Sequence, residues 1–335
     1  MRSYLQYEID TQVQLKGRRQ GLIEGLYRKQ KLLLEYDATM TRTAAEAFEA
    51  RAGNCLSLVI MTAAFAKEMG LPVRYQSVTI DDHWSRSGDM LLLAGHVNLS
   101  LGGRRTSGLG LTVLEMDMLT IDFIPPEHLP ALRSRVIEEN TVVAMYYNNR
   151  AAESIFAGRL DDAYWMARAA IVQDPRYHAA YITLGSIYRR HGDLATAERV
   201  LCHVLQSEPD NLLALGNLAI TLQEGGRLAE AKALNARLAK LQPYPPYAFF
   251  DRGILAMQAG DYQTARDLFQ QEVNRDAYAP EFHFWLALAS YQLGDLTAAR
   301  RHMQAATEYS TTTKDRGLYA AKLAYLQASR PSTTH

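Results

Sequence analysis

The most regular pattern of hydrophobic and polar positions lies in the C-terminal half of the chain. Stretches such as "YITLGSIYRRHGDLATAERVLCHVLQSEPD" place apolar residues three and four apart, with a glycine between two such runs. Aligned stretches repeat every 34 residues. The period is carried by Ala163, Ala197, Ala231, Ala265 and Ala299, by Gly158, Gly192, Gly226, Gly260 and Gly294, and by Pro175, Pro209 and Pro243. The pattern predicts stacked pairs of antiparallel helices.

Helices of about 12 to 15 residues are too short to be stable alone, so each pair must bury its apolar face against its neighbours. Small residues such as Gly185 and Ala197 allow close helix crossings, and Pro209 ends a helix. This period and residue placement resemble the tetratricopeptide repeat. The second repeat carries the family residues Tyr181, Leu184, Gly185, Tyr188, Ala197, Leu201 and Pro209.

The repeat register sets the expected domain boundaries. Five repeats are predicted at residues 144–177, 178–211, 212–245, 246–279 and 280–313, so that the array spans 144–313. The amphipathic stretch "KDRGLYAAKLAYLQAS" then predicts a capping helix at 314–330.

The resemblance implies a concave face that binds a peptide or helix of another protein. One version of the family grips a C-terminal carboxylate with lysines and asparagines, and the corresponding residues here are Asn148, Ala152, Thr183, Leu213 and Asn217. The basic residues are missing, so we do not expect binding of chaperone tails. Asn148 and Asn217 are the candidate partner-binding residues. Two roles stay open for the array: capture of a protein partner, or packing on the N-terminal domain alone.

The pattern changes in the N-terminal half, where helices and strands are mixed. Residues 38–50 and 55–69 are predicted helices, and Gly70 ends the second in the manner of a C-cap. Strands are expected in "VRYQSVTI", "MLLLAGHVNLSL" and "LTVLEMDMLTIDFI", with loops in "DDHWSRSGD" and "GGRRTSGLG". A helix packed on an antiparallel sheet is an α+β arrangement, predicted for residues 38–133. Residues 1–37 form a helical extension in which Gly17, Gly21 and Gly25 indicate close helix packing.

Cys55 stands at the first turn of the predicted helix 55–69, directly after "GN". A cysteine in this place is either a small core residue or a nucleophile. The second cysteine, Cys202, falls at a packing position of the second repeat, and we expect it in the core. Histidine on a following strand, in "GHVNLSL", and aspartate on the next, in "LTIDF", complete the order cysteine, histidine, aspartate.

This order, together with "RAGNCLSLVIMTAAFAKEMGLPVRYQSV", resembles the transglutaminase-like (papain-like) superfamily over roughly residues 40–130. A bacterial family joins such a domain to C-terminal tetratricopeptide repeats, and the chain resembles it over most of its length. The resemblance implies Cys55 as nucleophile, His96 as general base and acid, and Asp122 as the orienting carboxylate. Asp117 competes with Asp122 for that last role.

The implied chemistry suits these residue types. The thiolate is the reactive form of cysteine, and a helix N-terminus with a neighbouring imidazolium favours it. The backbone N–H of the nucleophile helps to bind an oxyanion. We also place Asn54, Gln76 and Trp84 as candidate cleft residues.

Composition excludes several classes of function. The chain has 36 basic residues (Lys and Arg) and 36 acidic residues (Asp and Glu), so its formal net charge is zero. A neutral chain lacks the overall positive charge that attracts nucleic acid, so we do not expect nucleic acid as a partner. No apolar stretch is long enough to span a bilayer, and no signal-peptide pattern opens the chain. Two separate cysteines make no disulfide framework and favour a cytoplasmic location, although removal of a signal would leave a periplasmic protein looking the same. We expect no cofactor and no metal site. The sequence leaves the oligomeric state open.

Two functions follow from these expectations. The first is a cysteine enzyme of the transglutaminase-like class that attacks an amide or peptide carbonyl, with hydrolysis or crosslinking as outcomes, while the repeats bind the protein substrate. The second is a non-catalytic adaptor in which both halves bind partners.

Overall fold

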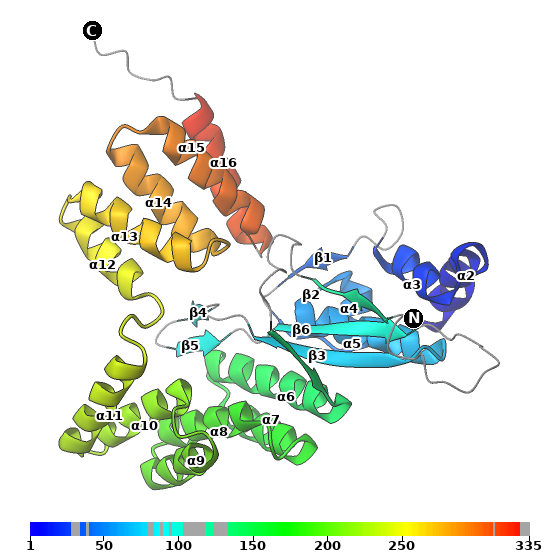
Figure 1. The fold of residues 1–335 in the computed structure, drawn as a ribbon, viewed down its shortest axis with the longest axis horizontal. Coiled ribbons are helices and arrows are strands. Elements are labelled where there is room, and N and C mark those ends of the chain that lie inside the picture. Colours follow the sequence, from blue (N-terminus) through cyan, green and yellow to red (C-terminus); the bar gives the residue numbers. More distant parts are fainter. Residues whose placement is uncertain are drawn as a thin grey trace. The chain divides into compact units, whose positions relative to one another are not determined.

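The computed structural model of the protein describes residues 1–27, 34–37, 40–79, 84–87, 90–93, 96–102, 118–123, 133–310 and 312–328, and Figure 1 shows its elements. The chain forms two compact units. Unit 1 comprises Met1–Ile80 and Gly95–Pro243, and unit 2 comprises Asp81–Ala94 and Tyr244–His335. This division differs from the predicted domains, because it separates the first three repeats from the last two.

The N-terminal residues of unit 1 form short helices: α1 (Arg2–Tyr4), the π-helical turn η1 (Leu5–Ile9), α2 (Asp10–Lys16) and α3 (Arg18–Tyr27). Gly17 makes the turn between α2 and α3 with a φ of 80°. A Cβ atom on Gly21 would lie 2.6 Å from the backbone nitrogen of Val13, so the two helices approach closely. The predicted close packing is confirmed at Gly21 and at Gly25, where a Cβ would lie 2.8 Å from the Ile9 side chain, but not at Gly17, where nothing lies within 4 Å.

This segment belongs to the same core as the residues that follow it. Ile9, Leu22 and Leu26 are buried in one cluster with the apolar side of helix α5 (Cys55–Glu68). Strand β1 (Glu35–Tyr36) also pairs in parallel with β2 (Ala52–Gly53), directly before α5. The predicted extension 1–37 therefore contains a strand as well as helices, and it packs against the core of the next segment.

A four-stranded antiparallel sheet lies in the middle of unit 1, in the order β7-β6-β3-β8. Its strands are β3 (Val73–Thr79), β6 (His96–Gly102), β7 (Met118–Ile121) and β8 (Arg133–Ile137). Alternate residues of β6 enter the core cluster that contains α5, namely Val97, Leu99 and Leu101. Side chains alternate across a strand, so the residues between them point to the opposite face.

Helix α4 (Ala44–Ala50) begins later than predicted. Thr43 caps it, and Glu46 completes a capping box with the Thr43 backbone N–H, so the helix starts at Ala44 and not at residue 38. A polar residue that satisfies the first free N–H groups fixes the helix start more firmly than helix propensity does.

The stretch after β3 also differs from the prediction. The expected loop 81–89 contains strand β4 (Trp84–Ser87), which pairs with β5 (Met90–Leu93) in unit 2. The single strand predicted for 90–101 is therefore two strands, β5 and β6, in different sheets. β4 is a strand because it pairs with β5. Its short polar sequence "WSRS" does not predict a strand on its own.

The repeat array of unit 1 consists of the predicted helix pairs. Its helices are α6 (Glu139–Phe156), α7 (Leu160–Gln173), α8 (His178–Arg190), α9 (Leu194–Ser207), α10 (Leu212–Glu224) and α11 (Leu228–Leu241). Every turn glycine of the 34-residue period has a positive φ, between 73° and 88°. Helix α6 begins at Glu139, five residues before the predicted start, because it follows β8 almost without a break.

Unit 2 contains the last two repeats and the cap: α12 (Ala248–Gln258), α13 (Tyr262–Arg275), α14 (Pro280–Gln292), α15 (Leu296–Tyr309) and α16 (Thr313–Ala328). The boundary between the units falls in "PYPP", at residues 243–246. Proline lacks the backbone N–H that helices need, so the chain there cannot continue a helix. A buried aromatic cluster around Phe250 and Phe269 forms the core between α12, α13 and α14.

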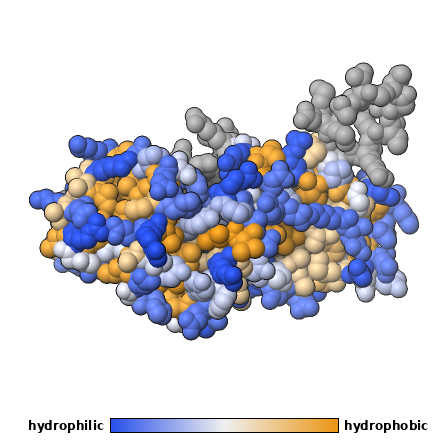
Figure 2. All heavy atoms as spheres, turned by 90° about the horizontal axis from the view of Figure 1, so that it is seen from below, coloured by the Kyte–Doolittle hydropathy of each residue, from blue (hydrophilic) through white to orange (hydrophobic). Residues whose placement is uncertain are grey.

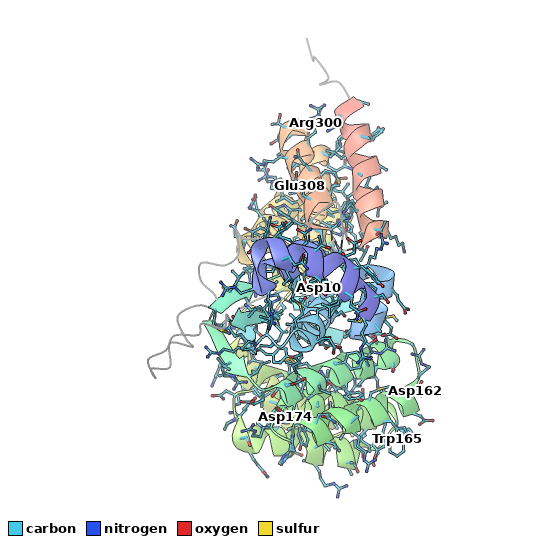
Figure 3. The ribbon with its side chains drawn as sticks, turned by 90° about the vertical axis from the view of Figure 1, so that its right-hand side faces the viewer. Asp10, Asp162, Trp165, Asp174, Arg300 and Glu308 are labelled. Carbon is cyan, nitrogen blue, oxygen red and sulfur yellow. The ribbon has the colours of Figure 1, made fainter. Side chains whose placement is uncertain are left out.

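The surface mixes hydrophobic and hydrophilic residues. On the face drawn in Figure 2, the hydrophobic groups are separated by hydrophilic residues. In unit 1, Figure 3 shows Asp162 and Trp165 of α7 on the outer side of the repeat helices, and 59% of Trp165 is exposed. Among the described helices, none is long and apolar enough to cross a membrane.

Candidate active site

Cys55 is the first residue of α5 and is half-buried. Asn54 is the N-cap of this helix, and its Oδ1 accepts hydrogen bonds from the backbone N–H of Ser57 at 2.9 Å and from the Ser57 hydroxyl at 2.7 Å. Cys55 therefore sits where the helix dipole and the free N–H groups favour a negative charge. Asn54, placed as a candidate cleft residue by sequence, holds the helix start.

His96 and Asp122 meet because their strands pair. Leu99 of β6 lies opposite Ile121 of β7, so Asp122, one residue further along, comes beside the start of β6. The Nε2 atom of His96 lies 2.6 Å from Oδ1 of Asp122, and only 4% of His96 is exposed. The structure thus brings together two residues that are 26 positions apart in the sequence.

Cys55 is the second side chain that acts on the imidazole of His96. Burial alone lowers the pKa of an imidazole, but the hydrogen bonds to Asp122 and Cys55, with the charges of both, outweigh it and raise the pKa of His96 from 6.5 to about 9. Since Nε2 is taken by Asp122, Nδ1 is the ring nitrogen left for the thiol. The three side chains form a continuous chain of contacts from Cys55 through His96 to Asp122.

Asn98 is a residue that the sequence interpretation missed. Its Nδ2 donates to Oδ2 of Asp122 at 2.9 Å, so it holds the carboxylate oxygen that His96 does not contact. Next along the strand, the hydroxyl groups of Ser100 and Thr120 lie 2.8 Å apart. The signal was present in "HVNLS", because every second residue of a strand shares a face with the histidine.

Tyr36 of β1 was also missed. Burial and the neighbouring Cys55 raise the pKa of the Tyr36 phenol, so Tyr36 lies beside the candidate nucleophile. No local pattern marks Tyr36, since its approach to Cys55 depends on the pairing of β1 with β2.

The other candidate cleft residues have different positions. Gln76 of β3 lies directly opposite Asn98 of β6, so it shares the sheet face of Asn98 and His96. Trp84 lies in β4 of unit 2, and its side chain is outside the described part of the structure, as is all of Asp117. Asp122 is the carboxylate that contacts His96 among the described residues.

The two candidate partner-binding residues make contacts inside the array. Asn217 of α10 accepts a hydrogen bond from the Ser186 hydroxyl at 2.9 Å and donates to the Leu213 carbonyl of its own helix, so it links α8 to α10. Asn148 of α6 lies beside the phenol of Tyr177, whose pKa burial raises to about 12, and among the described residues its Oδ1 is buried without a hydrogen-bond partner. That Asn148 and Asn217 bind a partner stays a prediction.

Cys202 of α9 is half-buried against the apolar cluster that α8, α9, α10 and α11 share, and burial raises the pKa of its thiol. Both cysteines of the chain are free. Within the described ranges, no group of three or more His, Cys, Asp or Glu side chains is arranged to hold a metal ion.

Comparisons with known families identify the repeats. Two sequence profiles of the tetratricopeptide repeat match residues 188–248 and 250–313. The chain therefore contains tetratricopeptide repeats over about residues 188–313. No curated protein sequence matches the chain. The sheet of unit 1 lies outside the matched region.

Solved structures with likeness to this chain include MamA RS-1 as a double mutant, with 16% identity, a TM-score of 0.30, and coverage of 51% of this chain and 95% of that one. PilF of Pseudomonas aeruginosa has 18% identity, a TM-score of 0.32, and coverage of 57% and 86%. A thermophilic tetratricopeptide protein of Thermus thermophilus has 17% identity, a TM-score of 0.32, and coverage of 55% and 98%. Likeness at this level says nothing about function.

Proposed function

We propose that the protein is a transglutaminase-like cysteine acyl-transfer enzyme whose tetratricopeptide repeats bind a protein substrate. The observation that supports this most is the contact chain from Cys55, at the N-terminus of α5, through His96 to Asp122, with 2.6 Å between His96 and Asp122. A nucleophile, a base and a group that orients the base are the three parts that covalent acyl transfer needs.

The reaction follows from these positions. His96 holds the proton of Cys55, and the thiolate attacks the carbonyl carbon of an amide. The C–N bond of the tetrahedral intermediate breaks as the His96 imidazolium protonates the leaving amine, which gives a thioester. A water molecule, losing a proton to His96, then attacks the thioester, and the C–S bond breaks to release the acid and the thiolate. An incoming amine in place of water gives a crosslink.

Asp122 keeps the imidazole of His96 in one orientation, with its Nε2 hydrogen on the carboxylate. Asn98 fixes that carboxylate in turn. We propose hydrolysis as the main outcome, and a cytoplasmic location in which a reducing environment keeps Cys55 as a free thiol.

The test is the rate at which iodoacetamide alkylates Cys55 between pH 4 and pH 10, with mass spectrometry separating it from Cys202. The proposal expects Cys55 to react well below pH 7, and His96→Ala to move the onset upward. The proposal is refuted if alkylation of Cys55 begins at no lower pH than alkylation of Cys202, both in the wild type and in His96→Ala. Profiling with acyl donors then distinguishes hydrolysis from crosslinking.

A second candidate function is a non-catalytic adaptor. The match of the repeat profiles to residues 188–313 supports it, because such repeats are protein-binding arrays. The combined variant Cys55→Ala, His96→Ala, Asp122→Asn discriminates between the two. Full cellular function of this variant would favour the adaptor, and its loss with partner binding intact would favour the enzyme.

A further inference from the structure

Thr41 is a buried contact point between the active-site helix and the repeat array, both within unit 1. Only 1% of Thr41 is exposed. Its hydroxyl oxygen accepts a hydrogen bond from Nδ2 of Asn54, the N-cap of α5, at 2.9 Å. Thr41 therefore contacts the residue directly before Cys55.

The same residue is held by helix α6, the first helix of the array. The Thr41 backbone N–H donates to Oε1 of Glu153 at 2.7 Å, and Nδ2 of Asn149 reaches the Thr41 hydroxyl at 3.3 Å. Arg150 donates to the Thr41 carbonyl at 3.4 Å and to Oε2 of Glu153 at 2.9 Å. Asn149 and Glu153 are four apart and so lie on one face of α6, with Arg150 beside Glu153 at a spacing of three.

Every polar group of Thr41 is thus bound by α6, across 108 to 112 positions of sequence. A second link runs beside it, since the backbone N–H of Arg42 donates to the Ser57 hydroxyl at 2.8 Å, which in turn donates to Asn54. This network thus contacts Asn54 and Ser57, the two residues whose hydrogen bonds cap α5 beside Cys55.

We propose that Glu153 and Thr41 are positioning residues for Cys55. The first repeat helix, α6, then helps to hold the nucleophile in place. The proposal rests on the proposed function of Cys55 as nucleophile. Glu153 and Arg150 fix the backbone of Thr41, Thr41 fixes the side chain of Asn54, and Asn54 fixes the first turn of α5. Thr41 and Glu153 act on the first turn of α5 through Asn54, and their effect is to keep the thiol aligned with His96.

The experiment compares Thr41→Val and Glu153→Ala with a matched control on the same helix. Glu139→Gln breaks the ion pair between Lys67 and Glu139, which joins α6 to the other end of α5, far along the helix from Cys55. The readout is the rate of Cys55 alkylation against pH, with Cys202 as internal reference, together with the midpoint of thermal unfolding of each variant.

Glu153→Ala removes the charge-assisted hydrogen bond to the Thr41 N–H and is expected to slow Cys55 alkylation at pH 7 by about tenfold. Thr41→Val removes the neutral hydrogen bonds of the Thr41 hydroxyl and is expected to slow it by about fivefold. Both are expected to move the onset to higher pH, while Cys202 is unchanged and Glu139→Gln reacts as wild type. Because the two residues act in one chain, the double variant is expected to lose no more than about the larger single effect. Thr41→Ser keeps the hydroxyl and is expected to restore the wild-type rate.

Two outcomes overturn the proposal in distinguishable ways. If wild-type Cys55 is activated and His96→Ala abolishes this, but folded Thr41→Val and Glu153→Ala keep the wild-type profile, the positioning role is wrong and the proposed function stands. If wild-type Cys55 reacts no faster than Cys202, the proposed function fails and the positioning role fails with it. Should Thr41→Val not fold, the comparison of Thr41→Ser, Glu153→Ala and Glu139→Gln decides in the same way.

Discussion

Replacement of His96 by glutamine is expected to lower the stability of unit 1 by an amount that depends on pH. His96 is buried, and its hydrogen bonds to Asp122 and Cys55 raise its pKa from 6.5 to about 9. A rise of this size corresponds to at most about 3 kcal/mol of folded-state stabilisation, because each tenfold change in proton affinity is worth about 1.4 kcal/mol.

The sign follows from the direction of the rise. A group whose pKa is higher in the folded than in the unfolded state stabilises the fold fully below the unfolded value and loses this as pH rises through the folded value. The contribution of His96 is therefore complete below pH 6.5 and lost as pH rises through about 9. The difference in unfolding free energy between wild type and His96→Gln is expected to shrink by about 3 kcal/mol across this range.

Urea unfolding followed by circular dichroism at pH 6 to 10 measures this difference. NMR titration of the histidine ring signals measures the pKa of His96 directly. The variant His191→Gln, at an exposed position, serves as the control. The effect of His96→Gln is read relative to that of this control at each pH. A His96 midpoint near 6.5, or a stability difference that is constant between pH 6 and 10, would refute the reasoning.

Three further substitutions test the packing of the described residues, and a fourth tests the site. In α8, Gly185→Ala is expected to destabilise by about 1–2 kcal/mol in thermal unfolding, because a Cβ there would meet the Leu201 side chain at 2.8 Å. Gly216→Ala in α10, where nothing lies within 4 Å, is expected to stabilise by about 0.5–1 kcal/mol, and equal effects at the two sites would contradict this. Glu272→Ala leaves two backbone N–H groups of α12 without their acceptor, at a cost of about 3 kcal/mol seen in the unfolding of unit 2, and a loss under about 1 kcal/mol would disprove it. Asn98→Ala removes the hydrogen bond to Oδ2 of Asp122 and is expected to slow Cys55 alkylation by about tenfold at pH 7, and an unchanged rate would argue against a positioning role of Asn98.

Local patterns were sufficient to predict the repeats. Each turn glycine has a positive φ, and Ala163, Ala197 and Ala265 are fully buried at the helix crossings that the 34-residue period indicates. A repeat array keeps its contacts between neighbours in sequence, so the spacing of small and apolar residues carries nearly all of its structure. The helix start at Cys55 was readable for the same reason, since Gly53, Asn54 and Ser57 form the cap within a few residues.

The strands were less readable, because pairing is not a local property. The run "WSRS" forms strand β4 only because it pairs with β5. The single strand predicted for residues 90–101 is divided between two sheets. The division of the repeats at Pro243 likewise depends on which helices contact one another, and the period continues across it unchanged.

The sequence by itself determined the repeat period, the helix that begins at Cys55, and the residue types from which a site could be built. Tertiary structure alone decided that His96 meets Asp122, that Asn98 and Tyr36 join them, and that Thr41 is held by α6. The physical reason is range. Caps, turns and helix periodicity are set within a few residues, whereas these contacts join positions 19 to 112 apart and exist only when strands have paired and helices have packed.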